Sequence, residues 1–261
     1  FLGMTAMAFS EHGSVLGWKH KKDIIEKAGM KYIHACEFYL TEDDIKEDKH
    51  RDNYHCVLIA KNYDGVKELN LLSSQSFNRD DWHFYYMPRI SVRDLYNTSD
   101  NIIITSACLA SVMNRGSVEL QKEMLRFFMQ NKHRCYLEIQ HHNCEEQIKY
   151  NQKLYKLHKK TNVPLIAGTD THALNKEYAE GRVVLQKAKD VVLELDRLNL
   201  NASYIKEKPH KVIISVGKYN LVVQNSRGEV LYLLFDFEKK EKMITTKNFD
   251  EYKQKLSEIS L

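Results

Sequence analysis

The sequence predicts an α/β fold in which strands and helices alternate, followed by a small α+β region. Short apolar runs rich in Val and Ile recur along the chain, as is typical of buried strands. Amphipathic helical segments separate these runs, and this order gives a parallel sheet or barrel. The last run, residues 163–167, comes directly before Asp170 and His172. Polar side chains therefore follow a strand at the edge where α/β proteins bind ligands.

Six strands are expected in this first part of the chain. They cover residues 4–9, 30–36, 55–60, 102–104, 134–140 and the run that begins at residue 163. Helices are expected over residues 18–27, 64–74, 119–131 and 144–160. Gly29 has the position of a C-cap and Asp64 that of an N-cap. Residues 78–97 form a polar and aromatic connection that includes Trp82, Phe84, Tyr85 and Tyr86.

Composition limits the class of protein. The chain has 261 residues and a formal charge of +4, which permits nucleic-acid binding without predicting it, since Lys and Glu are mixed along most helices. It has no apolar run of about 18 residues and no signal peptide, so no membrane association is expected. Five scattered cysteines without a Cys-x-x-Cys pair indicate a reduced, cytoplasmic protein.

Several side chains that can bind metals stand at or just after predicted strand ends: His12, Glu37, Cys108, Asp170 and His172. In a parallel barrel these ends share one mouth, so we expect the side chains to converge there. Their donor atoms suit a divalent metal such as zinc or manganese. Each residue alone has an ordinary alternative, such as a buried thiol for Cys108, and only the joint placement favours a site. His55 stands at the start of its predicted strand rather than at the end, so the strand pattern does not place it at this mouth. The alternative to a metal ligand is a buried core histidine with its hydrogen bonds satisfied.

Five ordered segments resemble the motifs of PHP (polymerase and histidinol phosphatase) domains. Residues 6–13 resemble the Asp-His-Gly segment of that family, and residues 35–39 its Gly-x-Glu-x-Tyr segment. Residues 54–62 resemble its His-Leu-x-Leu-Leu-Ala-Lys-Asn segment, and residues 105–109 its Thr-Ser-x-Cys-Leu segment. Residues 168–173 resemble its Asn-Asp-x-His-Tyr segment. The order is similar to that of the PHP domain in bacterial and phage DNA polymerase III α subunits, over roughly residues 1–190.

The resemblance implies a distorted (β/α)7 barrel with up to three metal ions at its mouth. It also implies phosphoester hydrolysis, such as 3′–5′ exonuclease activity in DNA replication, although some family members keep a degenerate, structural site. The metal ligands that it implies are His12, Glu37, His55, Cys108, Asp170 and His172. Zinc, manganese or iron would then stabilise phosphate charge and lower the pKa of a bound water.

The sequence also departs from the family pattern. The family's first strand carries a His-x-His pair and an acidic residue, and this sequence begins after that point. Glu11 stands where the motif has Asp. We therefore expect a barrel that lacks its first strand and has an open seam beside residues 4–9. The site is expected to be incomplete, with fewer than three ions or none, and its catalysis weaker than in the family or absent. No polymerase domain fits in the remaining residues.

Two domains are expected, a truncated PHP-like barrel over residues 1–190 and a small α+β domain of unknown family over residues 191–261. A helix over residues 177–200 leads into strands at 211–216, 219–223 and 229–237, with a hairpin turn at 225–228 and a closing helix over 249–259. The α+β region is either a separate domain or a patch over the open seam.

Two functions of different classes follow. The first is a metal-dependent phosphoesterase without polymerase activity that acts on nucleic-acid 3′ ends or small phosphates. The alternative is a non-catalytic binding or inhibitor protein of a phage or mobile element, in which the C-terminal domain contacts nucleic acid or a protein.

Overall fold

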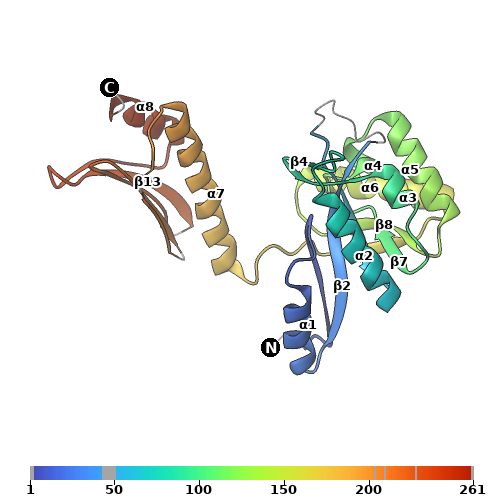
Figure 1. Ribbon diagram of the computed structural model, residues 1–261. Coiled ribbons are helices and arrows are strands. Elements are labelled where there is room, and N and C mark those ends of the chain that lie inside the picture. The colour runs from blue at the N-terminus through green and yellow to red at the C-terminus, as the bar shows by residue number, and fades with distance from the viewer. Residues whose placement is uncertain (1–2, 43–50, 203, 209, 227, 260–261) are drawn as a thin grey trace. The chain divides into compact units, whose positions relative to one another are not determined.

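The structure is a computed structural model that describes residues 3–42, 51–202, 204–208, 210–226 and 228–259 (Figure 1). The chain forms two compact units, Phe1–Asp170 and Thr171–Leu261. The predicted division between residues 190 and 191 falls inside helix α7 (Lys176–Arg197), which packs on the sheet of the second unit. The structure therefore places the division earlier, between Asp170 and Thr171.

The first unit contains an open, curled sheet. Its strands lie in the order β1 (Ala6–His12), β2 (Lys31–Thr41), β3 (Tyr54–Ala60), β7 (Ile102–Thr105), β8 (Cys135–Gln140) and β9 (Leu165–Gly168). The short strand β6 (Ile90–Ser91) pairs with the end of β2. Within the described residues, β1 and β9 are the two edges and do not pair with each other. This half-barrel agrees with the expected open seam.

Helices flank this sheet, and apolar side chains fill the space between them. The helices are α1 (Trp18–Lys27), α2 (Tyr63–Ser76), α3 (Val92–Tyr96), α4 (Val112–Arg115), α5 (Val118–Gln130) and α6 (Glu145–Thr161). Helices α1 and α2 lie beside β2, whereas α5 and α6 lie beside β8 (Figure 1). Phe38 and Leu137 of the sheet and Phe128 of α5 are fully buried in this core.

The start of α2 differs from the sequence prediction. Asn62, rather than Asp64, caps the helix: its backbone is extended, and its side-chain oxygen accepts a hydrogen bond from the Gly65 amide at 3.0 Å. Asp64 lies in the first turn, where a carboxylate is favourable beside the free amides of the helix start. Both residues suit a helix N-terminus, so only the observed backbone distinguishes them.

Strand β3 runs antiparallel to both of its neighbours, so the expectation of an all-parallel sheet is wrong. Parallel strands need a crossover of a dozen or more residues, usually a helix, whereas antiparallel strands need only a short return. Strand β2 extends past its predicted end at residue 36 to Thr41, so residues 42–53 are the shortest connection between neighbouring strands of this sheet, which favours an antiparallel return. The start of β3 consequently lies at the same edge of the sheet as the ends of β2 and β7.

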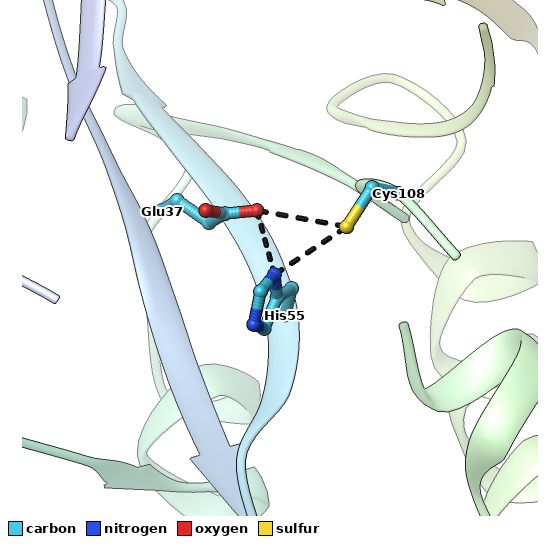
Figure 2. Close-up of side chains that lie close together, drawn as sticks. All are labelled: Glu37, His55 and Cys108. Atoms are coloured by element: carbon cyan, nitrogen blue, oxygen red, sulfur yellow. Dashed lines mark hydrogen bonds and ion pairs between the residues drawn. The ribbon is translucent and has the colours of Figure 1, made fainter. Parts of the chain in front are cut away.

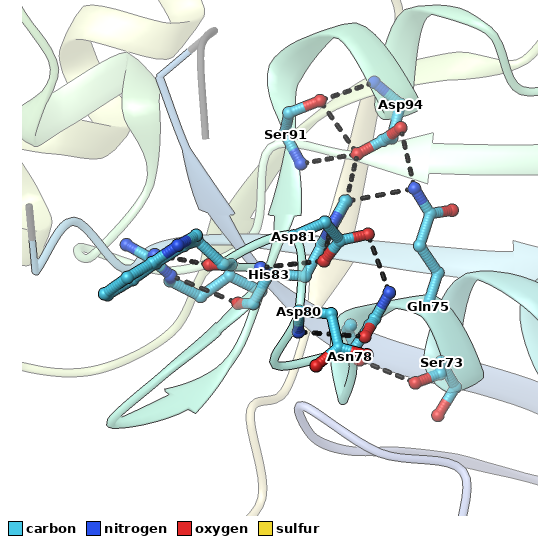
Figure 3. A network of polar contacts seen from close by, with 11 residues as sticks. Ser73, Gln75, Asn78, Asp80, Asp81, His83, Ser91 and Asp94 are labelled. Atoms are coloured by element: carbon cyan, nitrogen blue, oxygen red, sulfur yellow. Dashed lines mark hydrogen bonds and ion pairs between the residues drawn. The ribbon is translucent and has the colours of Figure 1, made fainter. Parts of the chain in front are cut away.

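Residues 78–97 contain a small hairpin, β4 (Phe84–Tyr85) and β5 (Met87–Pro88), held by a polar network (Figure 3). The buried His83 ring lies between two carboxylates, with Nδ1 2.7 Å from Asp81 and Nε2 3.2 Å from Asp94. Asp94 also accepts hydrogen bonds from the amide and hydroxyl of Ser91, both at 2.8 Å, which caps α3. The network fixes the connection before the hairpin.

Asp94→Asn tests this network through pH. Burial alone would raise the pKa of Asp94, but hydrogen bonds from His83 and Ser91 outweigh it and lower the pKa from 3.8 to about 2. A carboxylate with a lowered pKa stabilises the fold above its unfolded value and loses this contribution as the pH falls through the folded value. We expect the variant to lose about 2 kcal/mol of unfolding free energy at neutral pH, and the loss to shrink below about pH 4.

Urea unfolding at several pH values measures this difference. Asp64→Asn is the matched control, because Asp64 is exposed and pairs with the exposed Lys67 at 3.0 Å; it should change stability by less than about 0.5 kcal/mol. If the loss of unfolding free energy in Asp94→Asn stays constant down to acid pH, the electrostatic explanation is wrong.

The second unit is a five-stranded antiparallel meander packed against two helices. Its strands are β10 (Tyr204–Lys208), β11 (Lys211–Val216), β12 (Tyr219–Ser226), β13 (Glu229–Asp236) and β14 (Glu241–Thr246), followed by α8 (Phe249–Ile259). Apolar side chains of α7 and α8, including Val191 and Tyr252, share one core with the sheet. The expected α+β region is thus a compact unit, although residue 227 of its predicted turn lies outside the described residues.

Both edge strands of this meander were absent from the sequence prediction. Residues 205–208 of β10 are exposed and consist of one Ile followed by three charged residues, and β14 begins with Glu and Lys. Edge strands that carry charge lack the apolar pattern by which strands are recognised. Within the part of the chain that the structure describes, no helix is both long and apolar enough to cross a bilayer.

Candidate metal centre

Three candidate ligands from different parts of the sheet meet in the first unit (Figure 2). Nδ1 of His55 lies 3.0 Å from Oε1 of Glu37 and 3.4 Å from Sγ of Cys108. The Cys108 sulfur is 3.9 Å from the same carboxylate oxygen. One potential ligand atom from each of the three residues lies within 4.8 Å of the other two. They form a compact O, N, S donor group.

The antiparallel direction of β3 explains why His55 joins this group. In the β2–β3 register Tyr39 is opposite His55 and Glu37 is opposite Val57, so Glu37 and His55 are diagonal neighbours across the strand pair. The His55 amide also donates a hydrogen bond to the Ala110 carbonyl at 3.0 Å, which ties β3 to the loop that carries Cys108. His55 is therefore at the ligand edge although it opens its strand.

His12 approaches the group from β1. It pairs with Glu37 in the parallel β1–β2 register, and its Nε2 lies 3.0 Å from Oε2 of Glu37. The two oxygens of the Glu37 carboxylate thus face different partners, Oε1 toward His55 and Cys108 and Oε2 toward His12. Both His12 and Glu37 lie inside their strands rather than after them, because β1 and β2 continue beyond their predicted ends.

The electrostatics of the group favour a bound cation. Glu37 is only 5% exposed, and the side chain of His12 is 47% exposed. Burial opposes protonation of His55, yet its hydrogen bonds with Cys108 and Glu37 outweigh burial and raise the pKa of His55 to about 9. A proton on His55 therefore occupies the place that a metal cation would take. A metal ion must displace that proton, since imidazole binds metals in its neutral form.

The donor atoms fit the geometry of a zinc-like ion. Usual zinc–ligand bond lengths at tetrahedral angles put two nitrogen or oxygen donors about 3.4 Å apart, and either of them about 3.6 Å from a sulfur donor. The distances of 3.0, 3.4 and 3.9 Å around His55, Glu37 and Cys108 lie close to these values. Carboxylate, imidazole and thiolate ligands also match the preferences of zinc and iron.

Of the last two predicted ligands, Asp170 lies in the first unit and is not part of this donor group. Asp170 follows β9 in a left-handed backbone conformation, and its Oδ2 lies 3.9 Å from Nε2 of His142. Within the described residues, the donor group contains only Glu37, His55 and Cys108. His172 belongs to the second unit, so its participation stays a prediction. His142 follows the end of β8, the same kind of position by which the other candidates were selected.

Glu138, in β8, is a supporting residue that the sequence did not single out. Its carboxylate is buried and accepts hydrogen bonds from the Thr105 hydroxyl at 2.5 Å and from the Gln140 amide at 2.9 Å. The Thr105 oxygen in turn accepts from the Ala107 amide at 3.2 Å, where the backbone turns through φ 52° directly before Cys108. Glu138 thereby fixes the turn that presents the thiol.

Comparisons with known proteins show the family of this chain. Residues 2–142, more than half of the chain, match the PHP domain family, and the chain belongs to this family. It is 32% identical over 191 residues to the DNA polymerase III subunit alpha of Borreliella burgdorferi, covering 70% of this chain and 16% of that protein. It is 32% identical over 220 residues to the same subunit of Aquifex aeolicus, covering 77% of this chain and 18% of that one.

The chain thus spans less than a fifth of the length of these relatives. A crystal structure from Bifidobacterium adolescentis, described as a candidate metal-dependent phosphoesterase, aligns with 66% of this chain and 79% of its own at a TM-score of 0.41 and 14% identity.

Proposed function

We propose that this protein is a metal-dependent phosphoesterase that hydrolyses phosphodiesters, with nucleic-acid 3′ ends as the substrate class. The observation that carries the proposal is the O, N, S donor group of Glu37, His55 and Cys108 in a PHP domain. A divalent metal at such a group supplies positive charge for the phosphate oxygens and a water of lowered pKa.

The side chains around the group have distinct tasks in this proposal. Glu37, His55 and Cys108 hold the ion. His12 contacts Oε2 of Glu37, the carboxylate oxygen that does not face His55. His12 is the most exposed of the four and stands where a phosphate reaches the centre from solvent. The Tyr39 ring lies 5.1 Å from that of His55 and 6.4 Å from that of His12, and it shields one side of both from water.

The number of ions is part of the proposal. Glu37, His55 and Cys108 supply three ligands of one tetrahedral ion and leave its fourth position to water, and Asp170 and His172 are proposed ligands of a further ion. We propose fewer than three ions and slow hydrolysis. Polymerisation of DNA is not proposed, because the similarity to polymerase subunits lies in a region that is only 16–18% of their length.

Metal analysis together with a hydrolysis assay tests the function. The purified protein is stripped with a chelator and then dialysed against Mn²⁺, Zn²⁺ or Fe²⁺, and bound metal is counted by mass spectrometry. We expect about one or two ions per chain, and hydrolysis of a chromogenic phosphodiester and of an oligonucleotide only in the loaded protein. If none of the three metals binds and none supports turnover, the proposed function is wrong.

A further inference from the structure

An aromatic and basic cluster lies on the β4–β5 hairpin and beside it, and the metal centre does not use it. We call this cluster the aromatic hairpin; it consists of Arg51, Arg79, Trp82, Tyr85 and Tyr86. The Tyr86 side chain is 65% exposed at the turn between the two strands. A group of exposed aromatic rings, rather than a single exposed ring, is the feature that marks a binding surface.

The rings and guanidinium groups of the hairpin are arranged against one another. The Tyr85 and Tyr86 rings meet edge to face at 4.6 Å, and the Trp82 ring lies 5.8 Å from that of Tyr85. The Arg51 guanidinium lies over the Tyr86 ring at 3.9 Å and donates a hydrogen bond to its hydroxyl at 2.6 Å. Arg79 covers the Phe84 ring at 4.2 Å. Flat rings and exposed cations thus lie against one another in this cluster.

The fold holds this arrangement in an unfavourable backbone conformation. Trp82 and Tyr86 have φ angles of 65° and 61°, a region that bulky residues rarely occupy. Such conformations persist only where the surroundings impose them, and they are often associated with function. Here the buried Arg89 donates to the carbonyls of Trp82 and His83 at 3.1 and 3.4 Å, and so fixes the turn that carries the indole.

The aromatic hairpin adjoins the metal centre. Strand β5 lies beside β2, and its Pro88 ring packs against Gly13, the residue after His12. A Cβ on Gly13 would lie 2.9 Å from both Pro88 and Tyr39, so these three residues are in close contact. Tyr39 in turn packs against His12 and His55. A chain molecule that lies on Tyr86 therefore reaches the candidate ligands within a short distance.

We propose that the aromatic hairpin binds single-stranded nucleic acid and directs its end to the metal centre. Bases stack on Trp82 and Tyr86, and Arg51 and Arg79 contact the phosphates. Stacking on aromatic side chains beside exposed cations is the usual means of binding single strands without sequence preference. Asp81 pairs with His83, and both arginines are exposed, so each can reach an anion in solvent. The delivery of the strand end rests on the proposed function, whereas the binding does not.

Fluorescence anisotropy of a labelled oligothymidylate of about ten nucleotides tests the binding, with metal-free protein. We expect Tyr86→Ala to weaken binding about tenfold and Tyr86→Trp to retain it, since a base stacks on either ring. Tyr63→Ala is the matched control, because Tyr63 is also exposed and carries a cation, Lys67, over its ring at 4.9 Å, but lies on α2. Arg51→Ala should reduce the dependence of binding on salt.

The two proposals fail in distinguishable ways. Binding by the metal-free protein, together with no hydrolysis after the protein is loaded with Mn²⁺, Zn²⁺ or Fe²⁺, supports the aromatic hairpin and contradicts the enzymatic function. In an active protein, Tyr86→Ala should raise the KM for the oligonucleotide and leave hydrolysis of a small chromogenic phosphodiester unchanged, which also shows that the variant is folded. If the wild-type protein does not bind the oligonucleotide, or Tyr63→Ala weakens binding as much as Tyr86→Ala, the inference is wrong.

Discussion

Glu37→Gln should reduce metal-dependent hydrolysis at least about a hundredfold and abolish tight metal binding. Glu37 contacts three of the other candidate ligands, through Oε1 to His55 and Cys108 and through Oε2 to His12. Glutamine keeps the size of the side chain but removes the negative charge and one of the two acceptor oxygens. The expected loss therefore reports the carboxylate itself rather than the packing around it.

Glu11→Gln is the matched control for this experiment. Glu11 lies in β1 directly before His12, but its carboxylate is half-exposed and forms an ion pair with Lys21 at 2.5 Å. It should keep wild-type metal content and rate. Substitution with Co²⁺ gives a second readout, because a thiolate–cobalt absorption band should be present in Glu11→Gln and absent in Glu37→Gln and Cys108→Ser. Unchanged metal content and biological activity in Glu37→Gln would instead favour the non-catalytic binding protein.

Gly168→Ala should destabilise the first unit by about 3–5 kcal/mol. A Cβ at this position would lie 1.9 Å from Oε1 of Glu138 and 2.5 Å from its Cδ. The Glu138 side chain cannot move away cheaply, because it is buried and holds hydrogen bonds with Thr105 and Gln140. The added methyl group must displace that carboxylate and leave buried polar groups without partners, which thermal or urea unfolding measures directly.

A double-mutant cycle isolates the cause of this loss. Glu138→Ala alone should also destabilise the protein, since it leaves the Thr105 hydroxyl and the Gln140 amide unpaired. In that background, however, Gly168→Ala has room, and we expect it to cost less than about 1 kcal/mol. The coupling energy should then be about 2 kcal/mol or more. Additive effects of the two substitutions would show that Gly168 does not accommodate Glu138.

The sequence by itself determined most of the elements and four residues of the centre. Local apolar periodicity is a property of neighbouring residues, so the helix over residues 18–27 and the strand over 211–216 were predicted at their observed bounds. The PHP motifs named His12, Glu37, His55 and Cys108, which the structure brings together. These four residues could be named from the sequence because each lies in a short motif that resembles the family's pattern.

Only the tertiary structure decided how distant segments are placed. The direction of β3 depends on its neighbours rather than on its own residues, and it is this direction that brings His55 to the ligand edge. The contact of Gly168 with Glu138 joins two strands, so neither residue stands out alone in the sequence. The aromatic hairpin appeared only as a polar and aromatic connection, because the contacts that order it come from α2, α3 and β2. Interactions between residues far apart in the chain determine these features. The hydrophobic pattern of neighbouring residues does not depend on such interactions and therefore cannot predict them.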